Sequence, residues 1–88
     1  MSQREKLIAR FLAIPKDFTI DELDSLMSGF GMLKGSRGKT SGSAIEYFYP
    51  PSGRVFKIHS PHPGRIVKTY ALRAAVEFLS SENLIKKG

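Results

Sequence analysis

The chain has 88 residues, enough for one small domain, and its hydrophobic content of 41%, with six phenylalanines and three tyrosines, is too high for a disordered chain. It contains no cysteine, which excludes a disulfide framework and any thiolate metal site. No apolar run is long enough for a signal peptide or a membrane span, so we expect a cytoplasmic protein without a membrane partner.

The charges are unevenly distributed along the chain. Residues 1–33 contain four Lys or Arg against five Asp or Glu, a net charge of −1, whereas residues 34–88 contain ten against three, a net charge of +7. Within residues 34–73, only Glu46 opposes eight basic side chains. A basic surface can simply be a solvated one, but this concentration favours a positive face that binds nucleic acid.

Two amphipathic helices are predicted in the first third of the chain. The first covers residues 2–14, where Ser2 and Glu5 have the spacing of a capping box and a proline ends the pattern. The second begins after Thr19, which forms another capping box with Glu22, and two glycines near residue 30 supply its stop signals. The apolar stripes expected to face the core are Leu7, Ile8, Phe11 and Leu12 in the first helix and Leu23, Leu26, Met27 and Phe30 in the second.

From residue 32 the pattern changes to the period of a strand. A short edge strand is predicted in residues 32–38, a second strand in residues 43–49 and a third in residues 54–59, with a turn over residues 50–53. In the second strand, Ile45, Tyr47 and Tyr49 are expected on one side and Ala44, Glu46 and Phe48 on the other. In the third strand, Phe56 and Ile58 are expected to face one way and Val55, Lys57 and His59 the other.

A third helix is predicted over residues 69–84, with Thr69 as its N-cap, after a connector stiffened by prolines. The expected order of elements is therefore helix, helix, three strands, helix. This is an α+β fold in a single domain, with a three-stranded antiparallel sheet, helices on one face and the other face open to a partner.

Two histidines in "KIHSPHPG" are candidates for chemistry. His59 and His62 could share a metal ion, but no Cys, Asp or Glu lies near them and zinc takes three or four ligands, so we predict no metal site. They are better suited to general acid–base chemistry, because imidazole titrates near neutral pH. The alternative is structural: His62, held between two prolines, hydrogen-bonds the backbone and fixes the turn.

The run "KGSRGKTSGS" is a candidate phosphate-binding loop. Its glycines allow backbone N–H groups to approach a phosphate, and Lys34, Arg37 and Lys39 add positive charge. The alternative is a flexible hairpin loop. Tyr47, Phe48 and Tyr49 could in principle stack on bases, but alternation along a strand makes most of them packing residues.

Over residues 19–84, the chain resembles the HicA family, the RNA-cleaving toxins of bacterial toxin–antitoxin pairs. The resemblance is carried by "KGSRGKTSGS" before the second strand, by "YPPSGRVFKIHSPHPG", whose Pro-His-Pro-Gly element is the most specific, and by the helix "TYALRAAVEFL". It implies a double-stranded-RNA-binding-domain-like fold, with residues 2–14 as an additional helix. It also implies a metal-independent mRNA interferase without a small-molecule cofactor, neutralised by a HicB-like antitoxin protein.

The family's catalytic histidine directly follows the Gly-Ser at the head of the second strand. Counting back from "PPSGR" puts Ala44 at that position, whereas taking "KGSR" as the motif would put Arg37 there. Either the chain is a divergent member that uses Arg37, His59 or His62, or the histidine has been replaced by alanine. A catalytically silent RNA-binding module of the same fold is the alternative to an active enzyme. The residues expected to contact RNA or its phosphates are Lys34, Arg37, Lys39, Ser43, Lys57, Arg65, Lys68 and Arg73.

Overall fold

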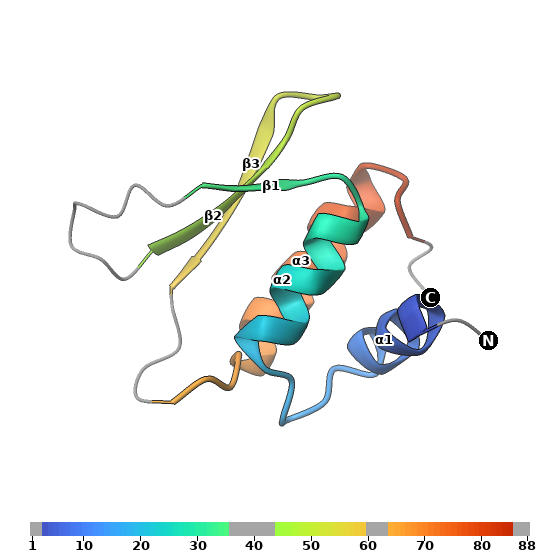
Figure 1. The fold of residues 1–88 in the computed structure, drawn as a ribbon, viewed down its shortest axis with the longest axis vertical. Coiled ribbons are helices and arrows are strands. Elements are labelled where there is room, and N and C mark those ends of the chain that lie inside the picture. Colours follow the sequence, from blue (N-terminus) through green and yellow to red (C-terminus); the bar gives the residue numbers. More distant parts are fainter. Residues whose placement is uncertain (1–2, 36–43, 60–63, 86–88) are drawn as a thin grey trace.

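The computed structural model describes residues 3–35, 44–59 and 64–85, and it confirms the predicted α+β fold with the element order α-α-β-β-β-α (Figure 1). The three strands form one antiparallel sheet in the order β1-β2-β3. Within the described ranges, no helix combines the length and the apolar character needed to cross a membrane. The elements are α1 (Gln3–Leu12), α2 (Ile20–Gly29), β1 (Leu33–Gly35), β2 (Ala44–Tyr49), β3 (Arg54–His59) and α3 (Thr69–Ser81).

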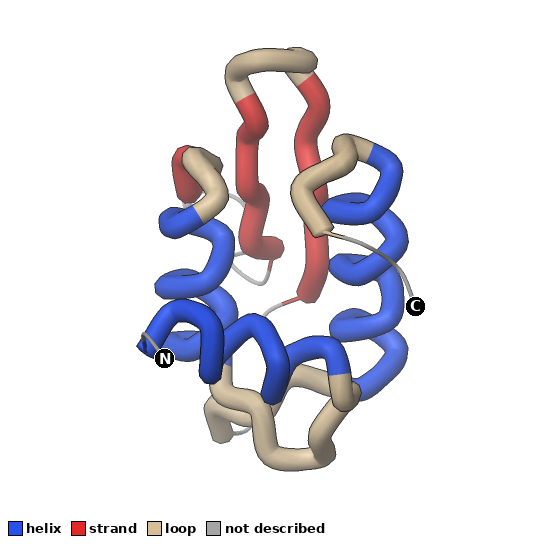
Figure 2. The backbone as a smooth tube through the Cα atoms, turned by 90° about the vertical axis from the view of Figure 1, so that its right-hand side faces the viewer, coloured by secondary structure: helices blue, strands red, loops and turns tan. Residues whose placement is uncertain are grey.

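The elements are arranged in three layers. The sheet is covered on one face by α2 and α3, and α1 lies across these two helices on the side away from the sheet (Figures 1 and 2). The prediction that helices pack on one face of the sheet is therefore correct for α2 and α3. The additional helix α1 instead packs on the other helices, where Phe11 is fully buried and its ring centroid lies 5.8 Å from that of Phe18.

The register of the sheet confirms the predicted alternation of its side chains. Tyr47 of β2 pairs with Phe56 of β3, and both are buried against the helices together with Ile58. Residues of the opposite parity face away from the helices, because successive side chains of a strand point to opposite sides. We call this surface the open face of the sheet, and its exposed residues are Leu33, Phe48, Val55, Lys57 and His59.

The N-terminus of α2 has the predicted capping box. The Thr19 hydroxyl accepts a hydrogen bond from the Glu22 N–H at 3.2 Å, and the Glu22 carboxylate accepts one from the Thr19 N–H at 2.9 Å. These two bonds satisfy the backbone N–H groups of Thr19 and Glu22, which would otherwise be unpaired at the start of the helix. The helix ends at a C-cap residue, Phe30, followed by Gly31 with φ of +90°, as its predicted stop signal requires.

The start of α3 corrects one prediction, since Thr69 is the first helical residue and not the N-cap. The Lys68 carbonyl already accepts the N–H of Leu72 at 3.1 Å, four residues on, and this bond makes Lys68 the cap residue. The Lys68 side chain makes no capping bond. At the start of α1, the predicted capping box involves Ser2, which lies outside the described residues.

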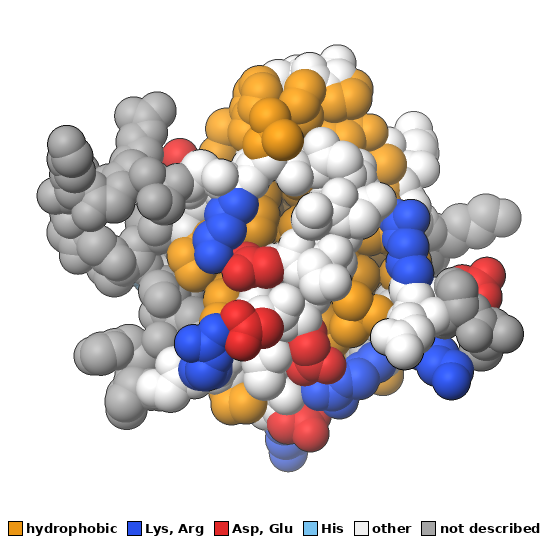
Figure 3. Space-filling view, in the orientation of Figure 1, with side chains coloured by type: hydrophobic (Ala, Val, Ile, Leu, Met, Phe, Trp, Pro, Cys, Tyr) orange, Lys and Arg blue, Asp and Glu red, His pale blue; other side chains and the backbone are white. Residues whose placement is uncertain are grey.

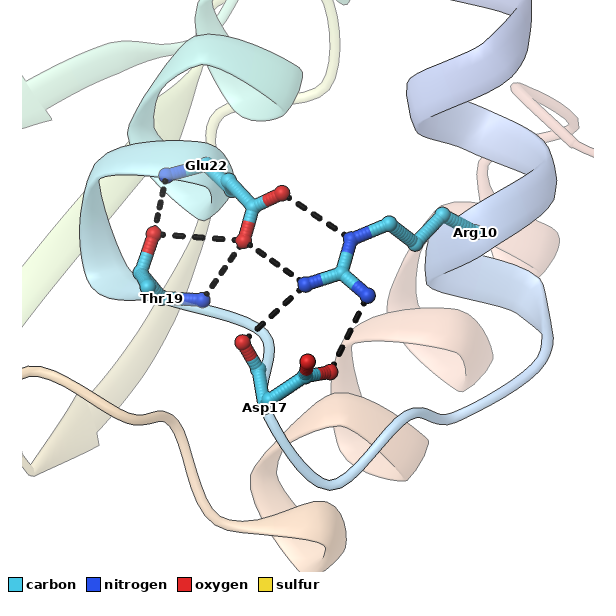
Figure 4. A network of polar contacts seen from close by, with 4 residues as sticks. All are labelled: Arg10, Asp17, Thr19 and Glu22. Carbon is cyan, nitrogen blue, oxygen red and sulfur yellow. Dashed lines mark hydrogen bonds and ion pairs between the residues drawn. The ribbon is translucent and has the colours of Figure 1, made fainter.

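The arginine of the last turn of α1 fixes this helix to α2 (Figure 4). The Arg10 guanidinium donates to both carboxylate oxygens of Glu22, at 3.0 and 3.1 Å, and to the side chain and carbonyl of Asp17, each at 3.0 Å. The bond from Arg10 lowers the pKa of Glu22 to about 2, and the same carboxylate raises the pKa of Arg10. One carboxylate therefore caps α2 and holds α1 in place.

We predict that Phe11→Ala lowers the free energy of unfolding by about 3–5 kcal/mol, because it removes a fully buried ring and leaves a cavity. The measurement is denaturant unfolding of both proteins. Leu12→Ala is the matched control, since the neighbouring Leu12 is 38% exposed and its loss should cost much less. Equal losses in the two variants would show that α1 is not docked through Phe11.

We predict that the contribution of Glu22 to the free energy of unfolding is lost at low pH. A carboxyl whose folded pKa lies below its unfolded value of 4.5 adds stability above that pH, and this stability is lost as the pH falls toward 2. Between pH 4.5 and pH 2, the wild type should therefore lose more free energy of unfolding than Glu22→Gln. Solvent screening of this partly exposed pair keeps the difference to about 1 kcal/mol. Parallel losses in the two proteins would contradict the assignment.

Candidate nucleic-acid interface

Three of the predicted site positions lie together at one end of the sheet. Ala44, the first residue of β2, pairs with His59, the last residue of β3. In the same ladder Glu46 pairs with Lys57, and the Lys57 Nζ lies 3.5 Å from the Glu46 Oε2. Position 44 and His59 therefore lie directly opposite each other in the ladder. The predicted residues Arg37, Lys39, Ser43 and His62 lie outside the described ranges.

An apolar row crosses the open face of the sheet near its other end, next to the β2–β3 turn. Leu33 of β1 pairs with Phe48, which in turn pairs with Val55 of β3. The three side chains are 59%, 39% and 49% exposed. The alternation of side chains along each strand places all three on the open face. The row was not among the site residues predicted from the sequence.

Lys34 is directed away from the open face and has a partner within the chain. It pairs in register with buried Tyr47, and its Nζ lies 2.9 Å from the Asp24 Oδ2. The Tyr47 hydroxyl donates to the other oxygen of Asp24. Burial, together with this bond to a carboxylate, raises the pKa of Tyr47. Asp24 therefore anchors β1 and β2 to α2.

Arg65 likewise has an acidic partner, because its guanidinium donates to both oxygens of Asp21. Figure 3 shows the resulting surface, on which basic and acidic side chains alternate over α2. Lys34 and Arg65 thus lie on a flank of α2 where their charges are partly compensated, and they are separated from Lys57 by the thickness of the sheet.

The remaining predicted cations belong to the N-terminal part of α3. Lys68 and Arg73 are both exposed, and within the described part of the chain neither forms an ion pair. Between them, Tyr70 has 64% of its surface exposed. Tyr70 was not among the site residues predicted from the sequence.

The three aromatic residues of β2 that were considered for base stacking differ in their exposure. Tyr47 is only 1% exposed, so it cannot stack on a base, and its role is packing. Tyr49 is half-buried against the core. Phe48 is the one of the three that lies on the open face.

No group of three His, Asp or Glu side chains that could hold a metal ion occurs among residues 3–35, 44–59 and 64–85. A groove of about 690 Å³ lies between α1 and α2, and none of the predicted site residues lines it.

No protein-family model, curated protein or solved structure matches this chain.

We predict that Tyr47→Phe lowers the free energy of unfolding by about 1–3 kcal/mol, because it removes a hydrogen bond to a carboxylate at a buried position. Tyr49→Phe, the same chemical change on the same strand, is the control and should cost less than about 0.5 kcal/mol. Chemical denaturation near neutral pH measures both values. If the two variants are equally stable, the bond to Asp24 does not contribute to holding the sheet on α2.

Proposed function

We propose that this chain is a HicA-like RNA-binding protein of the mRNA interferase type, a metal-independent endoribonuclease fold neutralised by a HicB-like antitoxin. The observation that carries the proposal is the position of residue 44. It opens β2 and lies opposite His59 at one end of the open face of the sheet. The resemblance to the HicA family expects the reacting histidine at this residue. The element order and the excess of basic residues after residue 33 also support the proposal.

The proposed chemistry requires no metal ion. Cleavage of RNA through its 2′-hydroxyl needs a base to remove the hydroxyl proton, an acid to protonate the leaving 5′-oxygen, and positive charge to stabilise the phosphorane. A histidine at position 44 would be a direct cross-strand neighbour of His59, so the two imidazoles could divide the roles of base and acid. Lys57, two residues from His59 on the same face, would supply positive charge for the phosphorane, although it is also paired with Glu46 at 3.5 Å.

A second candidate function is favoured by the alanine itself. Ala44 has no group that can transfer a proton, so the chain as it stands lacks one member of the proposed pair. A catalytically silent RNA-binding module would need the same positive surface and no imidazole at this position. In either case the net charge of +6 favours acidic groups on an inhibitory protein partner.

The test is to restore the imidazole. Ala44→His should raise the rate of cleavage of single-stranded RNA by about 10²-fold or more in the presence of a chelator, because a positioned acid or base contributes about 10²–10⁴-fold. Ala44→Gln controls for size and polarity without a titratable group. Adding His59→Asn to Ala44→His should lower the rate again if the two imidazoles act as a pair. The products are resolved on denaturing gels.

Equal cleavage by Ala44→His and Ala44→Gln would reject the enzymatic assignment and leave the silent module. RNA affinity then separates the outcomes further, because binding through phosphates weakens as the salt concentration rises. An affinity that stays constant from low to high salt would contradict both candidate functions.

A further inference from the structure

The N-terminal part of α3 presents an exposed aromatic ring between two cations. Tyr70 has the largest exposed fraction among the large hydrophobic side chains of the described residues, at 64%. Lys68 precedes it by two residues and Arg73 follows it by three, which places Tyr70 and Arg73 on neighbouring positions of one helical face. Ile66, in the segment just before the helix, is also 44% exposed.

These two cations differ from most others in the described part of the chain because they are uncompensated. Five other Lys or Arg side chains form ion pairs with carboxylates, whereas Lys68 and Arg73 form none within the described ranges. Their charges therefore remain available to an external anion. The five paired cations are Arg10, Lys34, Arg54, Lys57 and Arg65.

The segment that carries the ring is held firmly by the rest of the fold. The Val67 N–H donates to the Phe18 carbonyl at 2.8 Å, and the Ile20 N–H donates to the Arg65 carbonyl at 2.8 Å. Val67 itself is buried. Because this backbone is already fixed by bonds to the start of α2, binding would cost little further ordering there.

An exposed ring beside unpaired cations fits a single-stranded nucleic acid. A base can stack on the ring while the adjacent phosphates meet the cations, whereas the bases of a duplex are already stacked on one another. We infer that Tyr70 is a base-stacking residue for single-stranded RNA, and that Lys68 and Arg73 bind phosphates of the same strand. This inference rests on the proposed function, because it takes RNA as the ligand.

The location of the ring relates it to the candidate site. Arg54, which begins β3, pairs with Glu82, just beyond the end of α3, so the strand and the helix run in opposite directions. The end of β3, which His59 forms, and the start of α3, which carries Tyr70, consequently lie toward the same end of the molecule, away from the β2–β3 turn (Figure 1). A strand held at Tyr70 would thus be bound at the same end as position 44.

The stacking role is tested by fluorescence anisotropy with a labelled single-stranded RNA of mixed sequence and with the same sequence as a duplex. Tyr70→Ala should weaken single-strand binding by about 5- to 100-fold, and Tyr70→Phe should retain it, because the ring alone is needed. The loss should be much smaller for the duplex. Leu12→Ala, which removes an exposed apolar side chain of α1, should leave single-strand affinity unchanged.

The charge contribution has a matched control within the chain. The pair Lys68→Gln and Arg73→Gln lowers the formal net charge from +6 to +4, as does the pair Lys6→Gln and Lys16→Gln. Lys6 and Lys16 also form no ion pair among the described residues. Only the first pair should reduce the slope of log affinity against log salt by about 1.4, which is the loss of two phosphate contacts on a single strand.

The outcomes separate this inference from the proposed function. If the wild type binds no RNA, the proposed function fails and the inference fails with it. If the wild type binds RNA and Tyr70→Ala binds it equally well, the stacking role is overturned, the proposed function stands, and an acidic protein surface becomes the candidate partner of this patch. Equal losses in the two charge pairs would overturn the assignment of the phosphates to Lys68 and Arg73.

Discussion

The alternation of side chains along β2 and β3 is the constraint on which the rest of the structure depends. Burying Tyr47, Phe56 and Ile58 against α2 and α3 fixes the register of the sheet, because a slip of one residue would exchange its two faces. The same register necessarily turns Lys57 and His59 to the outside. The packing that stabilises the fold therefore also defines the open face and the pairing of position 44 with His59.

Internal ion pairing then decides which charges remain for a ligand. The sequence shows an excess of basic residues after residue 33, but Lys34, Lys57 and Arg65 each have a carboxylate partner in the folded chain. Such exposed pairs contribute little to stability, yet each lowers the local positive potential. Among the described basic residues that follow residue 33, Lys68 and Arg73 differ because neither forms an ion pair in the described part of the chain. Net charge indicates the class of partner, whereas the distribution of pairs indicates where it would bind.

Local patterns predicted most of the fold, and contacts between distant segments account for what they missed. The capping box of Thr19 and Glu22 and the alternation in β2 act within a few residues, so the sequence reveals them directly. It could not show that Asp24 meets Tyr47, because that contact joins residues 23 apart and depends on how the sheet lies on α2. The docking of α1 through Arg10 is of the same kind. At the site, the alternation predicted the exposure of His59 but not its pairing with residue 44.

Ala44 has a different meaning in the folded chain than in the sequence. In the sequence it is a residue without chemistry, where the resemblance to the HicA family implies a histidine. In the ladder it is the direct neighbour of an exposed imidazole, at the end of a sheet whose other face is packed on the helices. Proton transfer requires that the acid and the base be held in fixed positions, and the pairing of β2 with β3 fixes the positions of residues 44 and 59. If the proposed function is correct, the chain retains the framework of an acid–base pair, and a single imidazole separates the silent binder from the nuclease.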